Sequence, residues 1–153
     1  MSQDRAYENC KFASAIKPQT DITTAGTTYN GAAAASSTYI DTLGYDGATI
    51  VLDTGTFGGN GTATVSIVTG STDDPAAASA VSGAAFTAVD TSNDETQYTG
   101  YVLTNEYDRY LWVKNVKGGT GNAPVACTVV LDRFQKRPVL AQTSLSFCVD
   151  ASA

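Results

Sequence analysis

The feature that most constrains the fold of this chain is an alternation of apolar and polar residues with a period of two. In TATVSIV, at residues 62–68, Ala63, Val65 and Ile67 fall on one face and hydroxyl side chains fall on the other. Successive side chains of a β-strand point to opposite faces of a sheet, so this alternation predicts a half-buried strand. VACTVVLD, at residues 125–132, repeats the pattern with an apolar residue at every second position.

Further strands are predicted at residues 11–16, 38–43, 48–53, 84–89, 98–103 and 109–116. The segments between them, such as GTFGGNG, TGSTDDP and KGGTGNAP, are rich in Gly, Asn, Asp and Pro, which favour turns. About eight strands separated by turns are typical of an antiparallel β-sandwich. We therefore expect an all-β, jelly-roll-like sandwich with extended N- and C-terminal arms.

The alternation also predicts which side chains face the core. These are Ala48, Ile50 and Leu52 in one strand, Leu111 and Val113 in a second, and Val125, Cys127, Val129 and Leu131 in a third. Tyr110, Trp112 and Val116 are expected on the face opposite Leu111.

Helical signals are sparse. Asp73 or Asp74 could cap one short turn with Pro75 at its first position, followed by residues 76–80. The low-complexity stretch NGAAAASS, at residues 30–37, is predicted to be a loop, because its alanines lack polar partners at helical spacing.

The length of 153 residues suits one domain that buries its own core. We expect an N-terminal arm at residues 1–11, the sandwich at 12–139 and a C-terminal extension at 140–153. The initiator Met, with no export signal after it, predicts synthesis in a reducing cytosol. Three widely spaced cysteines, Cys10, Cys127 and Cys148, imply no disulfide framework.

Charge and hydropathy argue against two classes of partner. The chain has 9 basic and 15 acidic residues, a net charge of -6, so it gains no counterion-release energy from a phosphate backbone. No apolar run approaches the ~20 residues that span a bilayer. We expect neither nucleic acid nor membrane as a direct partner.

Residue types that carry catalysis are scarce. The chain has no histidine, which removes the commonest general base and transition-metal ligand. No G-x-S-x-G or C-x-x-C spacing occurs, and catalysis by two carboxylates is left as the weakest alternative. We predict a protein that is not an enzyme, with no catalytic, cofactor-binding or metal-binding residues.

The glycine-rich stretch GTFGGNG, at residues 55–61, resembles a phosphate-binding loop only superficially. A strand follows it instead of a helix, and it has no Lys before a Ser or Thr. We predict a long hairpin turn, with Phe57 either against the sandwich or offered to a neighbour.

Two other clusters have alternative readings. The acidic loops at Asp73-Asp74 and at residues 90–95 lack EF-hand spacing, and solvated turns are favoured over a structural calcium site. An aromatic cluster could stack on sugars, but core packing and oligomer contacts are favoured. Its members are Tyr98, Tyr101, Tyr107, Tyr110 and Trp112.

The C-terminal region supplies the candidate interface. Arg133, Lys136 and Arg137 form a basic exit from the last strand of the sandwich, and Pro138 ends that strand. Beyond it, Leu145, Phe147 and Val149 form an apolar stripe, which is expected to pair with its own sheet edge or with another subunit. The basic exit either pairs with an acidic partner surface or is simply solvated.

Six phrases, taken in order, resemble a family of small head decoration, or cement, proteins of tailed bacteriophages. They are AIKPQT (15–20), DTLGYDGATIVLDTGTF (41–57), TATVSIVTGSTDDPAAASAV (62–81), YTGYV (98–102), DRYLWV (108–113) and PVACTVVLDRFQKRPV (124–139). The match covers residues 12–139, and the C-terminal extension departs from the family pattern.

The resemblance implies a structural virion protein on the outer surface of the capsid, made in the host cytoplasm. It would bind the major capsid protein across subunit junctions as a homo-oligomer, with a trimer favoured, and it brings no cofactor. The alternative is another virion β-protein, a head fibre or tail component that binds carbohydrate.

Overall fold

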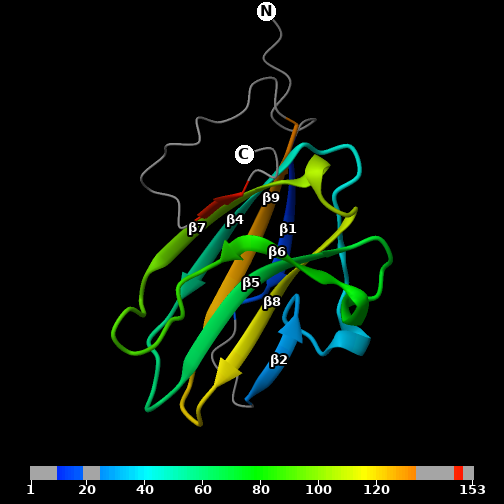
Figure 1. Ribbon diagram of the computed structural model, residues 1–153. Coiled ribbons are helices and arrows are strands. Elements are labelled where there is room, and N and C mark those ends of the chain that lie inside the picture. The colour runs from blue at the N-terminus through cyan, green and yellow to red at the C-terminus, as the bar shows by residue number, and fades with distance from the viewer. Residues whose placement is uncertain (1–9, 19–24, 134–146, 150–153) are drawn as a thin grey trace, which may run out of the picture.

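The structure, a computed structural model, describes residues 10–18, 25–133 and 147–149. They form two β-sheets, which lie one in front of the other in Figure 1. One sheet has the order β1 (Cys10–Ile16), β9 (Val125–Asp132), β4 (Gly47–Thr54), β7 (Gln97–Leu103) and β10 (Phe147–Val149). The other has the order β2 (Gly26–Tyr29), β8 (Tyr110–Gly118), β5 (Thr62–Gly70) and β6 (Ser79–Ala85), with β3 (Ile40–Asp41) also paired to β8.

The strand order is that of a jelly roll. Apart from the hairpin β5–β6, each connection between the main strands crosses from one sheet to the other. This interleaving gives β1-β9-β4-β7 facing β2-β8-β5-β6, with antiparallel neighbours throughout. The all-β sandwich expected from the alternation is therefore confirmed.

The core lies between the sheets and is built from the faces that the alternation predicts. All the residues predicted to face inward are buried. They are Ala48, Ile50, Leu52, Ala63, Val65, Ile67, Leu111, Val113, Val125, Cys127, Val129 and Leu131. Burial of these apolar side chains contributes most of the favourable free energy of folding.

The opposite face of β8 is not simply solvent-exposed. Trp112 lies on that face, as predicted, yet its exposed fraction is 0%. A Cβ at Gly70 would lie 3.4 Å from the Trp112 ring and 3.6 Å from Ala78 Cα, so the turn after β5 folds over the indole. The turn that follows a strand can bury a side chain which alternation assigns to the outer face.

One strand was missed, and two strand predictions need correction. The four-residue strand β2 was not expected, because GTTY is too short to show a period. The strand predicted at 84–89 lies instead at Ser79–Ala85, so only its first two predicted residues are in β6, whose small side chains pair with β5 across a register shift. The strand predicted at 38–43 shortens to Ile40–Asp41, since only these residues reach β8.

The predicted capped turn is present and short. Asp74 Oδ1 accepts a hydrogen bond from the Ala76 N–H at 2.9 Å, and Pro75 begins the 3-10 turn η2 (Pro75–Ala77). The chain then returns to extended structure, so the predicted continuation to residue 80 is wrong. The loop predicted at 30–37 contains a 3-10 turn without a side-chain cap, η1 (Ala34–Ser36), and a third 3-10 turn, η3 (Thr104–Glu106), follows β7.

β1 begins at Cys10, so its first two residues fall in the range 1–11 that was expected to be an arm. Residues 1–9, 140–146 and 150–153, assigned to the arm and the C-terminal extension, lie outside the described residues. In the part of the chain that is described, no helix is long and apolar enough to cross a membrane.

Candidate functional site

The glycine-rich connection 55–61 belongs to the scaffold. It joins β4 to β5, which lie in different sheets and do not pair, so the predicted hairpin is wrong. Alternation shows where each strand begins but not which sheet it enters. Phe57 is 5% exposed and packs in the core, which decides between the two placements predicted for it.

A second crossing, residues 119–124 between β8 and β9, packs against the first. The Gly58 N–H donates to Asn122 O at 3.0 Å, and Asn60 Oδ1 accepts from the Thr120 N–H at 3.0 Å. A Cβ at Gly121 would overlap Gly58 O. Glycine at these positions therefore lets the two backbones come closer than any side chain would allow.

The acidic loop at residues 90–95, before β7, is hydrogen-bonded to the connection 55–61 at the same end of the sandwich. Asp94 Oδ2 accepts from the Phe57 N–H at 2.6 Å, and Glu95 Oε1 accepts from the Thr56 hydroxyl at 2.6 Å. Asp90 caps its own turn through Ser92. Among the described residues no group of three or more potential metal ligands gathers.

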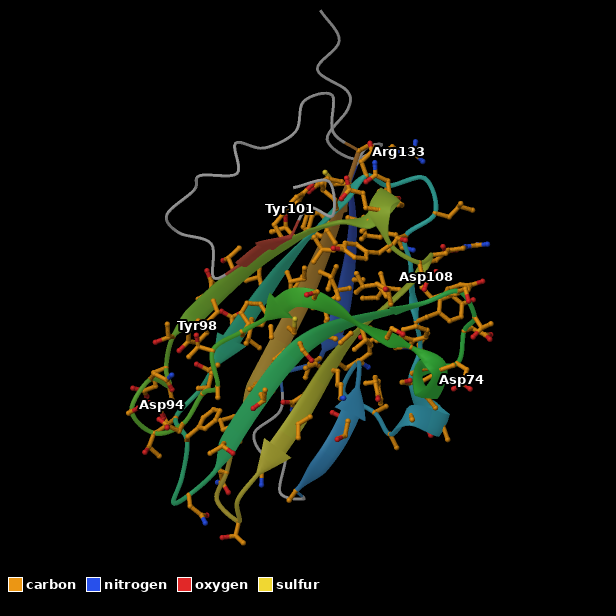
Figure 2. The ribbon with its side chains drawn as sticks, in the orientation of Figure 1. Asp74, Asp94, Tyr98, Tyr101, Asp108 and Arg133 are labelled. Carbon is orange, nitrogen blue, oxygen red and sulfur yellow. The ribbon has the colours of Figure 1, made fainter. Side chains whose placement is uncertain are left out.

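Arg133 lies at the opposite end, as Figure 2 shows by the positions of Arg133 and Asp94. Its Nε donates to Gly44 O at 2.5 Å, and its guanidinium lies 5.3 Å from the centre of the Tyr45 ring. The first residue of the predicted basic exit is thus bound to the loop before β4. Lys136 and Arg137 lie outside the described residues.

We call this region the Arg133 end and define it as residues 41–46, 104–109 and 133. Its loops are joined by the Thr42 hydroxyl, which donates to Arg109 O at 2.7 Å, and by the Thr104 hydroxyl, which donates to Tyr45 O at 2.8 Å. The Arg109 guanidinium holds Asp41 through two hydrogen bonds of 2.9 and 2.7 Å.

The paired guanidinium sets the ionisation of Asp41. The Arg109 hydrogen bonds, with a further one from the Leu43 N–H, lower the pKa of Asp41 to about 2. A shallow cavity of about 350 Å³ opens beside this pair, between the loops 42–46 and 104–109. Leu43, on its rim, is 66% exposed.

The predicted aromatic cluster is divided between the two sheets. Tyr98 and Tyr101 lie on β7, and Tyr101 is buried. Tyr110 and Trp112 lie on β8, where Tyr110 meets Tyr39 with ring centres 4.6 Å apart. Arg109 also lies over Tyr110, at 5.2 Å, so much of that ring is already in contact. Sequence proximity overstated the cluster, and it missed Tyr39.

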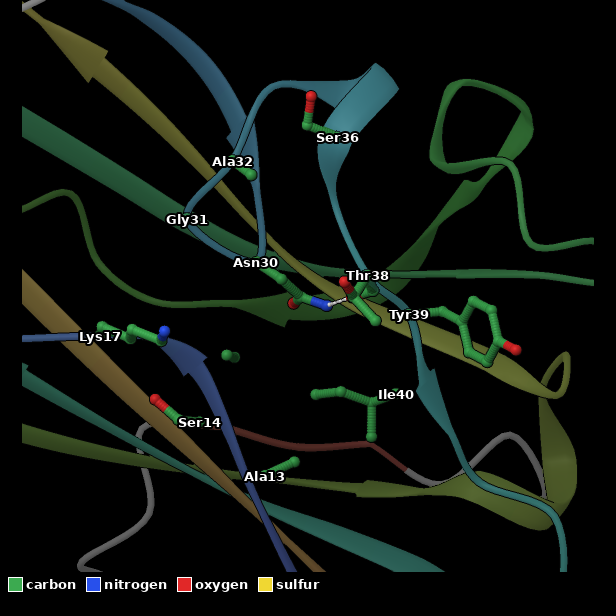
Figure 3. Close-up of a pocket in the computed structure, with 11 residues that line it drawn as sticks. Ala13, Ser14, Lys17, Asn30, Gly31, Ala32, Ser36, Thr38, Tyr39 and Ile40 are labelled. Carbon is green, nitrogen blue, oxygen red and sulfur yellow. Dashed lines mark hydrogen bonds between the residues drawn. The ribbon is translucent and has the colours of Figure 1, made fainter.

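A groove of about 470 Å³ runs between β1 and residues 30–40. Figure 3 shows Ala13, Ser14 and Lys17 on one side of it and Tyr39 and Ile40 on the other. Asn30 closes one wall by donating to Thr38 O. Lys17 is the one charged residue among those that line the groove, and most of the others are Ala, Gly, Ser or Thr. The sequence carried no sign of this groove, because the strands that frame it belong to different sheets.

Cys10 and Cys127 are poorly suited to act as nucleophiles, since both thiols hold their protons more tightly than usual. Burial raises the pKa of Cys127 to about 12. The Cys10 thiol donates to Asp132 Oδ1 at 2.9 Å, and this hydrogen bond raises its pKa.

Two polar residues of β8 face the core, which the sequence reading did not note. Asn115 and Lys117 are 1% and 2% exposed, and they continue the inward alternation of Leu111 and Val113. That alternation was the available signal. In the described part of the chain, Asn115 Oδ1 has no hydrogen-bond partner.

The C-terminal strand β10 pairs with its own sheet, in parallel with β7, and places Phe147 opposite Gly100 and Val149 opposite Val102. This is one of the two arrangements that the apolar stripe allowed. Leu145, the third residue of that stripe, lies outside the described residues.

Taken together, the described residues form two tightly bonded loop ends and a groove beside β1. No family model matches the chain, and no curated protein sequence matches it.

Proposed function

We propose that the chain is a structural virion protein, a capsid decoration or cement protein of a tailed bacteriophage. It binds the outside of the phage head and stabilises contacts between major capsid subunits. The observation that carries this proposal is the placement of the six family-like phrases, because they include parts of β1, β4, β5, β7, β8 and β9 of one jelly roll.

The fold is compatible with the role without fixing it. Jelly rolls occur in viral capsid proteins, lectins and cupins, and a fold alone does not determine function. Cupin-type metal chemistry usually relies on histidine, which this chain lacks. A cement protein needs rigidity and many repeated contacts, since avidity over a symmetric shell can replace strong single-site affinity.

The Arg133 end is the proposed capsid-facing surface. Arg133 leads into the basic exit with Lys136 and Arg137, which would pair with an acidic capsid surface and orient the subunit. The exposed Leu43 and the adjacent cavity add apolar contact area at the same end. The partner is the major capsid protein, and we propose a homo-oligomer, with a trimer favoured.

The test uses heads from a phage deleted for this gene, with purified full-length chain added back. We expect saturable binding in a fixed ratio to the major capsid protein and a higher temperature of head rupture. Arg133→Glu should weaken the binding, whereas Asp73→Asn, in the turn after β5, should not. Absence of the chain from wild-type virions would contradict the proposal.

A carbohydrate-binding head-fibre or tail protein is the second candidate. Tyr39, which is 39% exposed beside Tyr110, is the observation that favours it, because exposed aromatic faces stack on sugars. Glycan-array binding that is lost in Tyr39→Ala, together with localisation to a fibre or the tail, would support this candidate over cement.

A further inference from the structure

The two lateral edges of the β1-β9-β4-β7 sheet differ. β10 covers the β7 edge, whereas in the described part of the chain β1 pairs only with β9. The other side of β1 faces the 470 Å³ groove, and Gly31 packs against it only at Ala15 and Ile16, beyond the stretch from Lys11 to Ser14. An edge strand presents unpaired N–H and C=O groups that can bind another strand.

The side chains along β1 restrict which strand that could be. Lys11 and Lys17 lie at the two ends of this stretch, and small side chains line the groove between them. The Asp41 carboxylate near Lys11 is already bound to Arg109. A lysine on an edge disfavours a second lysine opposite it and favours an acidic residue there, which makes the register of pairing selective.

Phe12 gives a second restriction. Its side chain is 74% exposed on the outer face of the sheet, where Val130 is its neighbour on one side. An aromatic residue opposite it on an added strand would form a stabilising cross-strand pair.

We infer that residues 1–9 of a second copy of the chain add as an antiparallel strand to the open edge of β1. The sequence MSQDRAYEN supplies the required residues in order. Placing Glu8 opposite Lys11 puts Tyr7 opposite Phe12, Ala6 opposite Ala13 and Arg5 opposite Ser14. This register gives one ion pair, one aromatic pair and two small side chains beside the groove.

The same register is closed to the chain's own residues 1–9. Folding back in this way would make Asn9 and Cys10 the two central residues of a hairpin turn. Two-residue hairpin turns require positive φ at the first central residue, and in neither common type is the second central residue in the extended region. Cys10 is instead an extended strand residue in register with Asp132, and it is not among the residues with positive φ. A second copy has no such restriction, and nine extended residues reach about 30 Å, longer than β1.

A ring of copies in which each gives its N-terminal residues to the next would leave no β1 edge open. A ring of three matches the oligomer proposed above. The inference does not depend on a virion role, because it concerns only contacts between copies of this chain.

Cysteine cross-linking between two differently labelled copies tests the register. In full-length chains with Cys10→Ser and Cys148→Ser, Ala6→Cys protein is refolded together with Ala13→Cys protein and then oxidised. We expect a disulfide-linked heterodimer, because cross-strand Cβ atoms lie within disulfide reach. The matched control replaces Ala13→Cys by Ser71→Cys, in the turn after β5, and should give only background product.

Two results would overturn the inference. One is a cross-link yield no higher than in the Ser71→Cys control. The other is a chain carrying both Ala6→Cys and Ala13→Cys that forms only an internal disulfide, since this would place the segment on its own edge.

Deletion of residues 1–9 gives an independent measurement. Light scattering should then report the mass of one chain where the full chain reports a multiple of it, while circular dichroism shows that the sandwich still folds. Equal masses for the two proteins would contradict the inference, and neither measurement requires phage heads.

Discussion

The loops at the two ends of the sandwich are held together by different kinds of contact. Each end carries chain crossings between the two sheets. At the glycine-rich end, residues 55–61 and 119–124 are held by backbone approach, with Gly58 bonded to Asn122. At the Arg133 end, the loops are held by side chains, among them Thr104 on Tyr45 and Arg109 on Asp41.

This difference indicates where a partner can act. Backbone-to-backbone contact leaves no space for an added atom, and the carboxylates of Asp94 and Glu95 at this end are already bonded to Phe57 and Thr56. The glycine-rich end is therefore suited to rigidity. The Arg133 end exposes charged and apolar side chains beside a cavity of about 350 Å³. A surface held by side chains can be altered by substitution, pH and salt without losing the fold, which is what a binding surface requires.

The largest effect is expected from Gly121→Ala at the glycine-rich end. The new Cβ would overlap Gly58 O, and backbone cannot move aside as a flexible side chain can. We expect a loss of about 3 kcal/mol in the free energy of unfolding, measured in urea. Gly58→Ala is the matched control, because its Cβ would lie 3.5 Å from Asn122 N, an ordinary contact. Equal losses in the two variants would show that the interlocked crossings are not what holds this end.

A smaller effect is expected from Thr104→Val at the Arg133 end. Thr104 is buried, and its hydroxyl donates to Tyr45 O at 2.8 Å. Removing that donor should cost about 1–2 kcal/mol, because a partly buried carbonyl loses its partner. Thr56→Val, an exposed position at the other end, should change stability by less than about 0.5 kcal/mol. If Thr104→Val matched Thr56→Val, the side-chain bonds of the Arg133 end would be dispensable.

The Asp41–Arg109 pair should also give the Arg133 end a pH dependence. The folded-state pKa of Asp41 is about 2, below its ordinary value of 3.8, so its contribution to stability is present above about pH 4 and is lost as pH falls toward 2. An NMR titration of the Asp41 carboxyl should show this pKa, and Arg109→Gln should raise it toward 3.8. Arg133→Gln serves as the control and should leave it unchanged. A wild-type titration near 3.8 would mean that the Arg109 pair does not form in solution.

The smallest effect is expected from Arg133→Gln itself. The variant loses the cation–π contact with Tyr45, which at an exposed site contributes about 0.5–1 kcal/mol, and an exposed hydrogen bond to Gly44 O that water can replace. Thermal unfolding should shift only slightly, and Arg133→Lys should recover part of the shift. A loss as large as that of Gly121→Ala would assign Arg133 to the scaffold and weaken its proposed role in capsid contact.

Much of the fold could be predicted from the sequence, because alternation records which side of a strand is buried. Ile50, Val65 and Val129 are buried as expected, and Asp74 caps its turn. The candidate site was less accessible. The hairpin predicted at 55–61 is a crossing between sheets, and β2 is too short to carry a period.

The sequence by itself determined most of the strands, their inward faces and the absence of histidine chemistry, since these depend on local period and composition. Only the tertiary structure decided which strands share a sheet, which side chains meet and where an edge stays open. Tyr39 meets Tyr110, and Arg133 meets Tyr45, across wide separations in sequence. Such contacts depend on which strands are neighbours in the two sheets, and no local pattern of residues encodes that arrangement.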